Sequence, residues 1–196
     1  MADPVEVLDY WLGDIGPDGW YAAGDALDAD IRARFGDLWT AAHGGGLDHW
    51  VDGTVGTLAF IILCDQFSRN MHRGQADAFA TDARALTAAR QALALGYDIA
   101  APEPERQFFY MPFMHAENLD DQTLCARLFS ERMPDTGADH LIHARAHHAV
   151  IERFGRFPFR NAALGRTPTP AEDQFMADGA YGAVVSQIRA SHAMRA

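Results

Sequence analysis

The amino-acid sequence predicts an all-α protein, and two features carry that prediction. Apolar residues recur at helical spacing in nearly every periodic segment, and no segment alternates apolar and polar residues over a useful strand length. The ends of these segments carry the proline, glycine and capping residues typical of helix termini. With 196 residues, 48% of them hydrophobic, the chain is within the range of one domain with one sizeable core. We expect a single all-α domain over residues 1–196, with about eight helices.

Four helices are predicted in the N-terminal half. Asp3 is a candidate N-cap and Pro4 suits the first helical position, so the first helix begins there and ends at Gly13. The next three are expected at 26–43, at 53–68 and at about 79–95. Three consecutive glycines end the second of these four helices, and Gly96 ends the fourth.

Four further helices are predicted in the C-terminal half. Their expected ranges are about 104–117, 120–132, 137–154 and 170–178. The dipeptide Thr169-Pro170 marks the start of the last one. The tail over residues 180–196 has weak periodicity and is expected to fray.

Charge and composition argue against several classes of function. The chain has 27 acidic and 16 basic residues, which argues against general binding to nucleic acid or to anionic membrane surfaces. All the basic residues are arginine, so any cationic role falls to a side chain that favours forked recognition of carboxylate or phosphate. The longest apolar run, 58–64, is far shorter than the ~20 residues that a membrane span needs, and the N-terminus lacks a signal-peptide pattern. A cytoplasmic protein is expected, with Cys64 and Cys125 as reduced core thiols.

The predicted helix at 53–68 is apolar on all sides, which indicates burial, yet it leads into the polar string DQFSRN. Asp65, Gln66, Arg69 and Asn70 fall within an arc of about 140° at roughly 100° per residue. Buried polar groups need partners, because leaving one unpaired costs about 1–3 kcal/mol. Two interpretations stay open: an internal network with Asp65 paired to Arg69, or a site for a ligand.

Histidines line one face of the predicted helix at 137–154. His140, His143 and His147 lie within a sector of about 60° and share it with core-facing residues. The spacing of His143 and His147 is compatible with metal ligation, but a zinc or iron site needs three or four ligands. We therefore assign no residue to a metal and leave the cofactor open.

His115 and Glu117 follow Pro112, which would kink or restart a helix. Two residues apart, they converge only if the backbone leaves the helix near Glu117. Together with His147 they would form a two-histidine, one-carboxylate set that suits non-haem iron or zinc. The same three residues fit a general acid–base pair or hydrogen-bonded packing equally well.

The stretch RFGRFPFRN, residues 153–161, is the most unusual part of this acidic chain. Its glycine ends the preceding helix, and its proline forces the residue before it into an extended conformation, so the phenylalanines anchor the loop while arginines project elsewhere. These arginines either pair with acids and helix carbonyls or form an anion site with Arg69 and Arg73, near His115 and His147. Because only Asp65 and Glu117 are obvious local acidic partners, an anion site is favoured.

Four strings in the chain resemble the motifs of the bacterial domain-of-unknown-function 924 family. They are DQFSRNMHRG (65–74), FATDARAL (79–86), FFYMPFMHAE (108–117) and RFGRFPFRNAALGR (153–166). The resemblance spans nearly the whole chain, from DYWLG (9–13) to TPAEDQFM (169–176). It implies an all-α array similar to the tetratricopeptide-like superhelices, although no internal repeat is visible in the sequence.

The resemblance assigns three groups of residues to the family motifs. The first is Asp65, Gln66, Arg69, Asn70 and Arg73. The second is Tyr110, Pro112, His115 and Glu117, and the third is His147, Arg153, Gly155, Arg156, Pro158, Arg160 and Asn161. The chain departs from the pattern at Phe159, where the family usually has a histidine, at Ala149, where aspartate is common, and at Ala116, where serine is usual. If the missing histidine is a catalytic base or a metal ligand in the family, its absence favours binding over catalysis here.

Three functions are therefore weighed. The leading one is binding of a small anion or an acidic peptide end by the polar residues of the first and last motifs, namely Asp65, Gln66, Arg69, Asn70, Arg73, Arg153, Arg156, Arg160 and Asn161. The second is an enzyme, of hydrolase type, in which His115, Glu117 and His147 act as acid–base groups. The third is a partner-binding scaffold, by analogy with tetratricopeptide-like folds. The oligomeric state and the identity of the ligand are left open.

Overall fold

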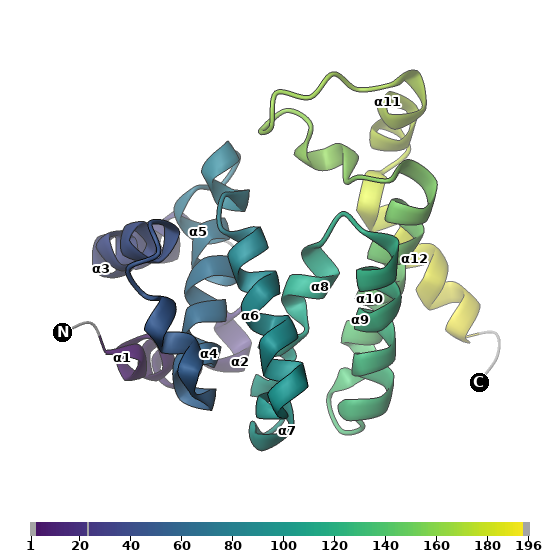
Figure 1. Ribbon diagram of the computed structural model, residues 1–196. Helices are drawn as coiled ribbons and strands as arrows, with labels where there is room; N and C mark the ends of the chain where they lie inside the picture. The colour runs from purple at the N-terminus through teal and green to yellow at the C-terminus, as the bar shows by residue number, and fades with distance from the viewer. Residues whose placement is uncertain (1–2, 23, 194–196) are drawn as a thin grey trace. The chain divides into compact units, whose positions relative to one another are not determined.

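The computed structural model describes residues 3–22 and 24–193, and every regular element within these ranges is a helix (Figure 1). The all-α prediction is confirmed. The chain divides into two compact units, Met1–Pro112 and Phe113–Ala196, which we call unit 1 and unit 2. One domain over the whole chain and a tetratricopeptide-like arrangement both stay predictions.

Unit 1 begins with the first predicted helix, which runs slightly further than expected. The first elements are α1 (Pro4–Leu8), the π-helical η1 (Asp9–Ile15), α2 (Gly16–Gly19), α3 (Asp25–His43) and the 3-10 segment η2 (Asp48–Asp52). Asp3 is the N-cap, since its side chain accepts a hydrogen bond from the backbone N–H of Val5 at 2.9 Å. The helix at 26–43 is confirmed within one residue.

The second half of unit 1 contains the buried helix. Its elements are α4 (Thr54–Ile61), the π-helical η3 (Ile62–Phe67), α5 (Ser68–Met71), the 3-10 segment η4 (Ala76–Phe79), α6 (Asp82–Leu95), α7 (Tyr97–Ala100) and the 3-10 segment η5 (Glu105–Phe109). Gly96 ends α6 in the left-handed conformation, with φ of 71°, as the sequence predicts. The helix expected at 104–117 is interrupted: η5 is followed by α8 (Met111–His115).

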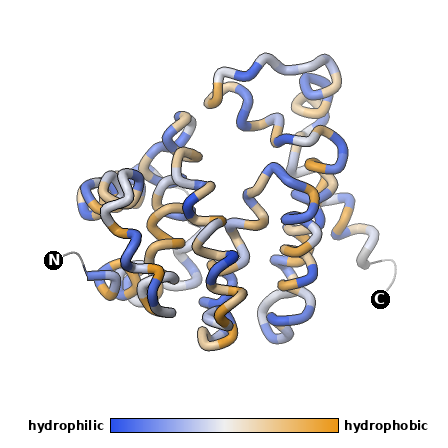
Figure 2. The backbone as a smooth tube through the Cα atoms, viewed as in Figure 1, coloured by the Kyte–Doolittle hydropathy of each residue, from blue (hydrophilic) through white to orange (hydrophobic). Residues whose placement is uncertain are grey.

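The core of unit 1 surrounds α4 and η3. Every residue from 57 to 68 is buried, which confirms the predicted buried helix, and Figure 2 shows the hydrophobic residues along α4. The ring of Phe67 lies 5.2 Å from that of Trp11 and 4.9 Å from that of Phe35, centroid to centroid. Such aromatic pairs contribute about 0.5–1.5 kcal/mol each beyond the burial of their area.

Unit 2 is organised around a helical hairpin. After α8 come α9 (Leu119–Arg132), α10 (Gly137–Phe154), the 3-10 segment η6 (Pro158–Arg160), α11 (Pro170–Ala177) and α12 (Ala180–Ala193). Helices α9 and α10 lie side by side and antiparallel (Figure 1), which their short connection requires. Gly137 allows this approach, because a Cβ atom there would lie 2.7 Å from the carbonyl oxygen of Phe129.

The C-terminal segment differs from its prediction. The sequence predicts fraying over 180–196, whereas Ala180–Ala193 form α12, which packs on α10; residues 194–196 lie outside the described part of the chain. Val184 packs against the buried cluster of Val150, Ile151, Phe157 and Phe175. The hydrophobic periodicity of this segment is too weak to predict the helix, because its burial depends on contact with α10.

The start of α11 is confirmed in detail. Thr169 and Glu172 form a capping box: the Thr169 side chain accepts from the Glu172 N–H at 3.3 Å, and the Glu172 carboxylate accepts from the Thr169 N–H at 2.6 Å. Within the described residues, no helix combines the length and hydrophobicity needed to cross a membrane.

Candidate functional site

The polar residues at the end of the buried helix form a network inside unit 1. Asp65 is fully buried and accepts a hydrogen bond from the side-chain amide of Gln66 at 2.6 Å. Arg69 forms a bidentate pair with Asp82, at 2.7 and 2.9 Å, while its nearest contact with Asp65 is 3.7 Å. The guanidinium also donates to the carbonyl of Ala78. The predicted pairing of Asp65 with Arg69 is thus secondary to a pairing that ties α5 to α6.

Asn70 and Arg73 have a common partner that the sequence analysis did not identify. Asp28, on α3, accepts from Asn70 at 2.8 Å and from two nitrogens of Arg73 at 2.8 and 2.9 Å. The hydrogen bonds from Arg73, assisted by that from Asn70, hold the pKa of Asp28 below its usual value although the residue is buried. The one clue in the sequence is the spacing of Asp28 three residues before Ile31, on the apolar face of its helix.

In unit 2 the backbone leaves helix α8 just before Glu117, as convergence of His115 and Glu117 requires. Helix α8 ends at His115, and Glu117 lies outside it. The Glu117 carboxylate accepts from the backbone N–H of Phe157 at 2.8 Å and from Arg166 at 2.7 and 3.0 Å. Burial raises the pKa of Glu117, but the hydrogen bonds from Arg166 and Phe157 outweigh it, so the pKa lies below its usual value. Glu117 is therefore an ionised carboxylate whose oxygens accept hydrogen bonds from Arg166 and from the backbone of Phe157.

The loop after α10 is centred on Phe157. Gly155 ends α10 with φ of 68°, and Phe157, before Pro158, is extended, both as predicted. The Phe157 ring is fully buried, and its carbonyl accepts from Arg166 at 3.0 Å. The guanidinium of Arg160 lies 4.6 Å from the centre of the Phe157 ring. The phenylalanine anchors the loop and positions the polar groups around it.

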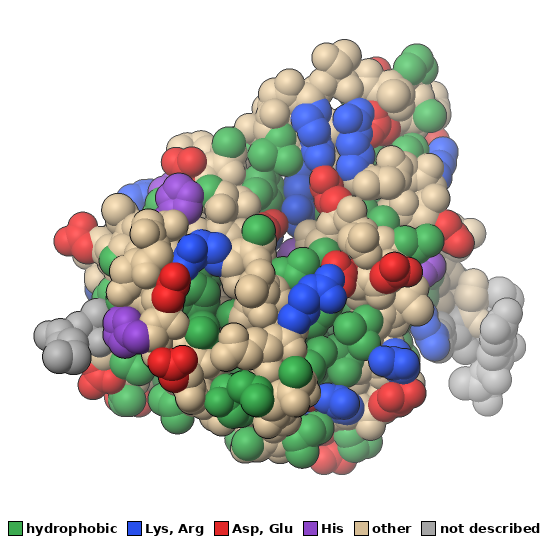
Figure 3. Space-filling model, viewed as in Figure 1, with side chains coloured by type: hydrophobic (Ala, Val, Ile, Leu, Met, Phe, Trp, Pro, Cys, Tyr) green, Lys and Arg blue, Asp and Glu red, His purple; other side chains and the backbone are tan. Residues whose placement is uncertain are grey.

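The three arginines of residues 153–161 have different environments. Arg156 forms a bidentate pair with buried Glu172, at 2.6 and 2.7 Å, and this pairing lowers the pKa of Glu172 strongly. Arg160, only 6% exposed, donates to the carbonyl of His115 at 3.0 Å. Arg153 is exposed, and its guanidinium lies over the ring of Phe154 at 4.7 Å. Arginine and acidic side chains lie beside one another over this part of unit 2 (Figure 3).

Asn161 holds the most unusual group of the loop. Its side chain is 5% exposed, and neither its amide nitrogen nor its amide oxygen has a hydrogen-bond partner among the described residues. The amide helps to lower the pKa of Glu172, although it forms no hydrogen bond of normal geometry with it. The Nε atom of Arg166 is likewise buried without a partner among the residues described. The backbone N–H of Arg166 donates to the Asn161 carbonyl at 2.8 Å, so the two residues are neighbours.

The histidines predicted on one face of α10 occupy three different environments. His147 has its Nδ1 atom 2.9 Å from the carbonyl oxygen of His143, so the proton lies on Nδ1 and the lone pair on Nε2. Burial, together with the electrostatic effects of His115 and Arg160, lowers the pKa of His147 to about 3. His143 contacts the Tyr181 hydroxyl at 2.6 Å through Nδ1, and His140 stacks on the ring of Phe129.

The two-histidine, one-carboxylate set is only partly brought together. The rings of His115 and His147 are 6.2 Å apart, centroid to centroid, but Glu117 is engaged by Arg166 and Phe157. Among the described residues, no group of three histidine, cysteine or acidic side chains is arranged to hold a metal ion. Arg166 and Glu172 were not identified as site residues from the sequence, although Arg166 ends a family-like string and Glu172 completes a capping-box spacing.

The described residues form a helical protein whose unit 2 contains a partly buried cluster of arginine–glutamate ion pairs. The chain belongs to the DUF924 family, whose description is a bacterial protein of unknown function and whose profile matches residues 7–180. The chain is similar to a solved protein of unknown function, ATU0120 from Agrobacterium tumefaciens, with 39% sequence identity and a TM-score of 0.83. That similarity covers 89% of this chain and 97% of the other. No curated protein matches the chain.

Proposed function

We propose that the protein binds a small oxyanion, a carboxylate or a phosphate, in the loop of unit 2 around Asn161 and Arg166. The observation that carries the proposal is the buried Asn161 side chain, whose amide has no partner among the described residues. A buried polar group of this kind costs about 1–3 kcal/mol when it stays unpaired, so its retention calls for an explanation such as a ligand or a bound water. An anion would accept hydrogen bonds from the Asn161 amide nitrogen and from the Nε atom of Arg166.

The neighbouring charges favour an anion over a neutral ligand. Arg166 keeps its Nη atoms on Glu117 and on the Phe157 carbonyl, so its buried Nε–H is available without breaking either contact. Arg153, in the last turn of α10 just before the loop, is exposed and forms no ion pair with any described residue, so its charge attracts anions over the Debye length of about 8–10 Å. Charge-assisted donors of this kind bind carboxylate and phosphate about twice as strongly as neutral ones.

The geometry favours binding over catalysis. A general base works best when its pKa is near the working pH, and the pKa of His147, at about 3, makes it too weak a base at neutral pH. Glu117 is held by Arg166 and by a backbone N–H, so it is a poor proton acceptor as well. We therefore interpret His147 and Glu117 as groups that shape the site.

The proposal is tested by calorimetric titration of the wild-type protein with inorganic phosphate, citrate, acetate and a peptide ending in Asp-Asp. We expect saturable binding of one anion class, and loss of at least about tenfold in affinity in Arg166→Gln, since a hydrogen bond from a charged group contributes about 1.5–3 kcal/mol. The matched control is Arg145→Gln, which removes the same charge from α10 outside the loop. Equal affinity in wild type and in Arg166→Gln contradicts the proposal, as does the absence of binding across the whole panel.

A further inference from the structure

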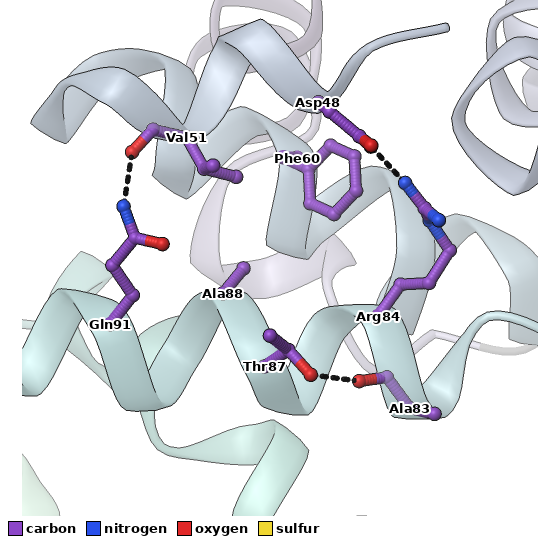
Figure 4. A pocket seen from close by; sticks show the side chains of 8 residues that line it. All are labelled: Asp48, Val51, Phe60, Ala83, Arg84, Thr87, Ala88 and Gln91. Carbon is purple, nitrogen blue, oxygen red and sulfur yellow. Dashed lines mark hydrogen bonds and ion pairs between the residues drawn. The ribbon is translucent and has the colours of Figure 1, made fainter. Parts of the chain in front are cut away.

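A second candidate site lies in unit 1, on α6 and the elements packed against it. A pocket of about 430 Å³ opens between η2 and α6 (Figure 4). This volume is within the range of about 300–1,000 Å³ that is usual for small-molecule sites. None of the residues that line it belongs to the family-like motif at 65–74 or to the loop of unit 2.

One end of the pocket carries an exchangeable positive charge. Arg84 forms an ion pair with Asp48, whose side chain is 65% exposed, and the Nε atom of Arg84 is buried without a partner among the described residues. An exposed ion pair of this kind contributes little to stability. A ligand carboxylate can therefore replace Asp48 on the guanidinium and gain the Nε–H donor in addition.

The middle of the pocket is apolar. Phe60 and Ala88 line it, and both are largely covered by neighbouring residues, with 2% and 3% exposure. The guanidinium of Arg84 lies 5.7 Å from the centre of the Phe60 ring. An aromatic ring placed here would meet the exposed part of Phe60 and the short side chain of Ala88, and aromatic pairs favour offset or edge-on contact.

The other end of the pocket offers a hydrogen-bond acceptor. The Gln91 amide nitrogen donates to the Val51 carbonyl at 3.2 Å, and its amide oxygen accepts no hydrogen bond from any described residue. Figure 4 shows that Gln91 and Arg84 project from the same side of α6. They are seven residues apart, so their backbones are separated by about 10.5 Å along the helix axis.

We propose that this pocket binds a flat aromatic carboxylate shorter than about 10 Å that carries a hydroxyl or N–H group opposite its carboxylate. The carboxylate pairs with Arg84, the ring packs on Phe60 and Ala88, and the distal group donates to Gln91. The proposal is independent of the anion site in unit 2, because the two sites share no residue.

The test is an NMR titration of the ¹⁵N-labelled full chain with 4-hydroxyphenylacetate and with the neutral 4-hydroxyphenylacetamide. We expect the acid to bind at millimolar concentration and to shift resonances within 48–51 and 83–91, while the amide binds at least about tenfold more weakly. Arg84→Gln should lose the preference for the acid, whereas Asp48→Asn should bind the acid more tightly, because the competing carboxylate is gone. Arg90→Gln, on α6 but outside the pocket lining, is the charge-matched control and should bind as wild type does.

A second variant keeps the test decisive if Arg84→Gln is poorly folded. Gln91 supplies the acceptor at the other end of the pocket, so Gln91→Leu should weaken binding of the acid without removing any charge. Equal binding of the acid and the amide overturns the proposal. The proposal is also overturned if Asp48→Asn weakens binding of the acid as much as Arg84→Gln does. That result would mean that the ion pair between Asp48 and Arg84 shapes the pocket and that the ligand does not replace Asp48.

Discussion

Replacing Asn161 with leucine is expected to stabilise the protein while abolishing anion binding. The Asn161 side chain is buried, and its amide has no hydrogen-bond partner among the described residues. Leucine is similar in volume and carries no polar atom, so it removes the desolvation penalty and leaves the packing in place. Because Asn161 is expected to lower the stability of the free protein, its presence is consistent with a role in binding.

The magnitude follows from the burial of the amide. An unsatisfied buried polar group costs about 1–3 kcal/mol, and 1 kcal/mol corresponds to about 2–4 °C in Tm for a chain of this size. The variant Asn161→Leu should therefore melt about 2–12 °C above the wild type when no ligand is present. The small contribution of the amide to the low pKa of Glu172 reduces this gain without reversing it, because Arg156 supplies the main effect.

The assay is differential scanning fluorimetry in a buffer free of phosphate and carboxylates. Asn118→Leu is the matched control, since Asn118 caps α9 by accepting from the N–H of Asp121 at 3.1 Å. Loss of that cap should lower stability by about 1 kcal/mol, opposite in sign to the change at Asn161. A fall in Tm for Asn161→Leu comparable to that for Asn118→Leu refutes the reasoning, because it means that the Asn161 amide is satisfied in the free protein.

Two further predictions concern α10 and its end. The folded pKa of His147, about 3, lies below its ordinary 6.5. The unfolded chain therefore binds this proton first, and stability should fall as the pH drops below 6.5, by up to about 1.4 kcal/mol per pH unit. In His147→Gln, the free energy of unfolding measured by urea denaturation should change less between pH 7 and pH 5 than in the wild type. An equal change with pH in the two proteins contradicts a neutral buried His147. Gly155→Ala should cost about 1–2 kcal/mol in the same assay, because φ is 68° there, whereas Gly13→Ala should cost little; equal costs contradict the left-handed cap.

The sequence predicts the helices well wherever their ends are marked by local chemistry. The Asp3 cap, the turn at Gly155 and the Thr169 capping box all depend on residues within a few positions, and all three are found as expected. Helix α12 is different, because its burial depends on packing against α10. A partner distant in the sequence leaves no local pattern.

The same distinction applies to the candidate site. The prediction that Asp65 and Arg69 lie on one face assumed a regular α-helix with about 100° per residue. Residues 62–67 are instead π-helical, which changes the direction of the side chains that follow. Arg69 consequently pairs best with Asp82. The acids that engage the other arginines, Asp28 and Glu172, come from other elements of their unit, so no spacing within a motif could identify them.

The most direct test of the proposed anion site is an NMR titration that observes the side-chain amide of Asn161. The full chain is labelled with ¹⁵N, and Asn161→Leu assigns the resonance by its disappearance. Binding of phosphate or of a carboxylate at Asn161 predicts a saturable shift of this amide, and of the Arg166 Nε–H, at concentrations that leave the Asn118 amide unmoved. The proposed site is contradicted if the Asn161 amide resonance does not shift while other residues report binding, or if no anion shifts it.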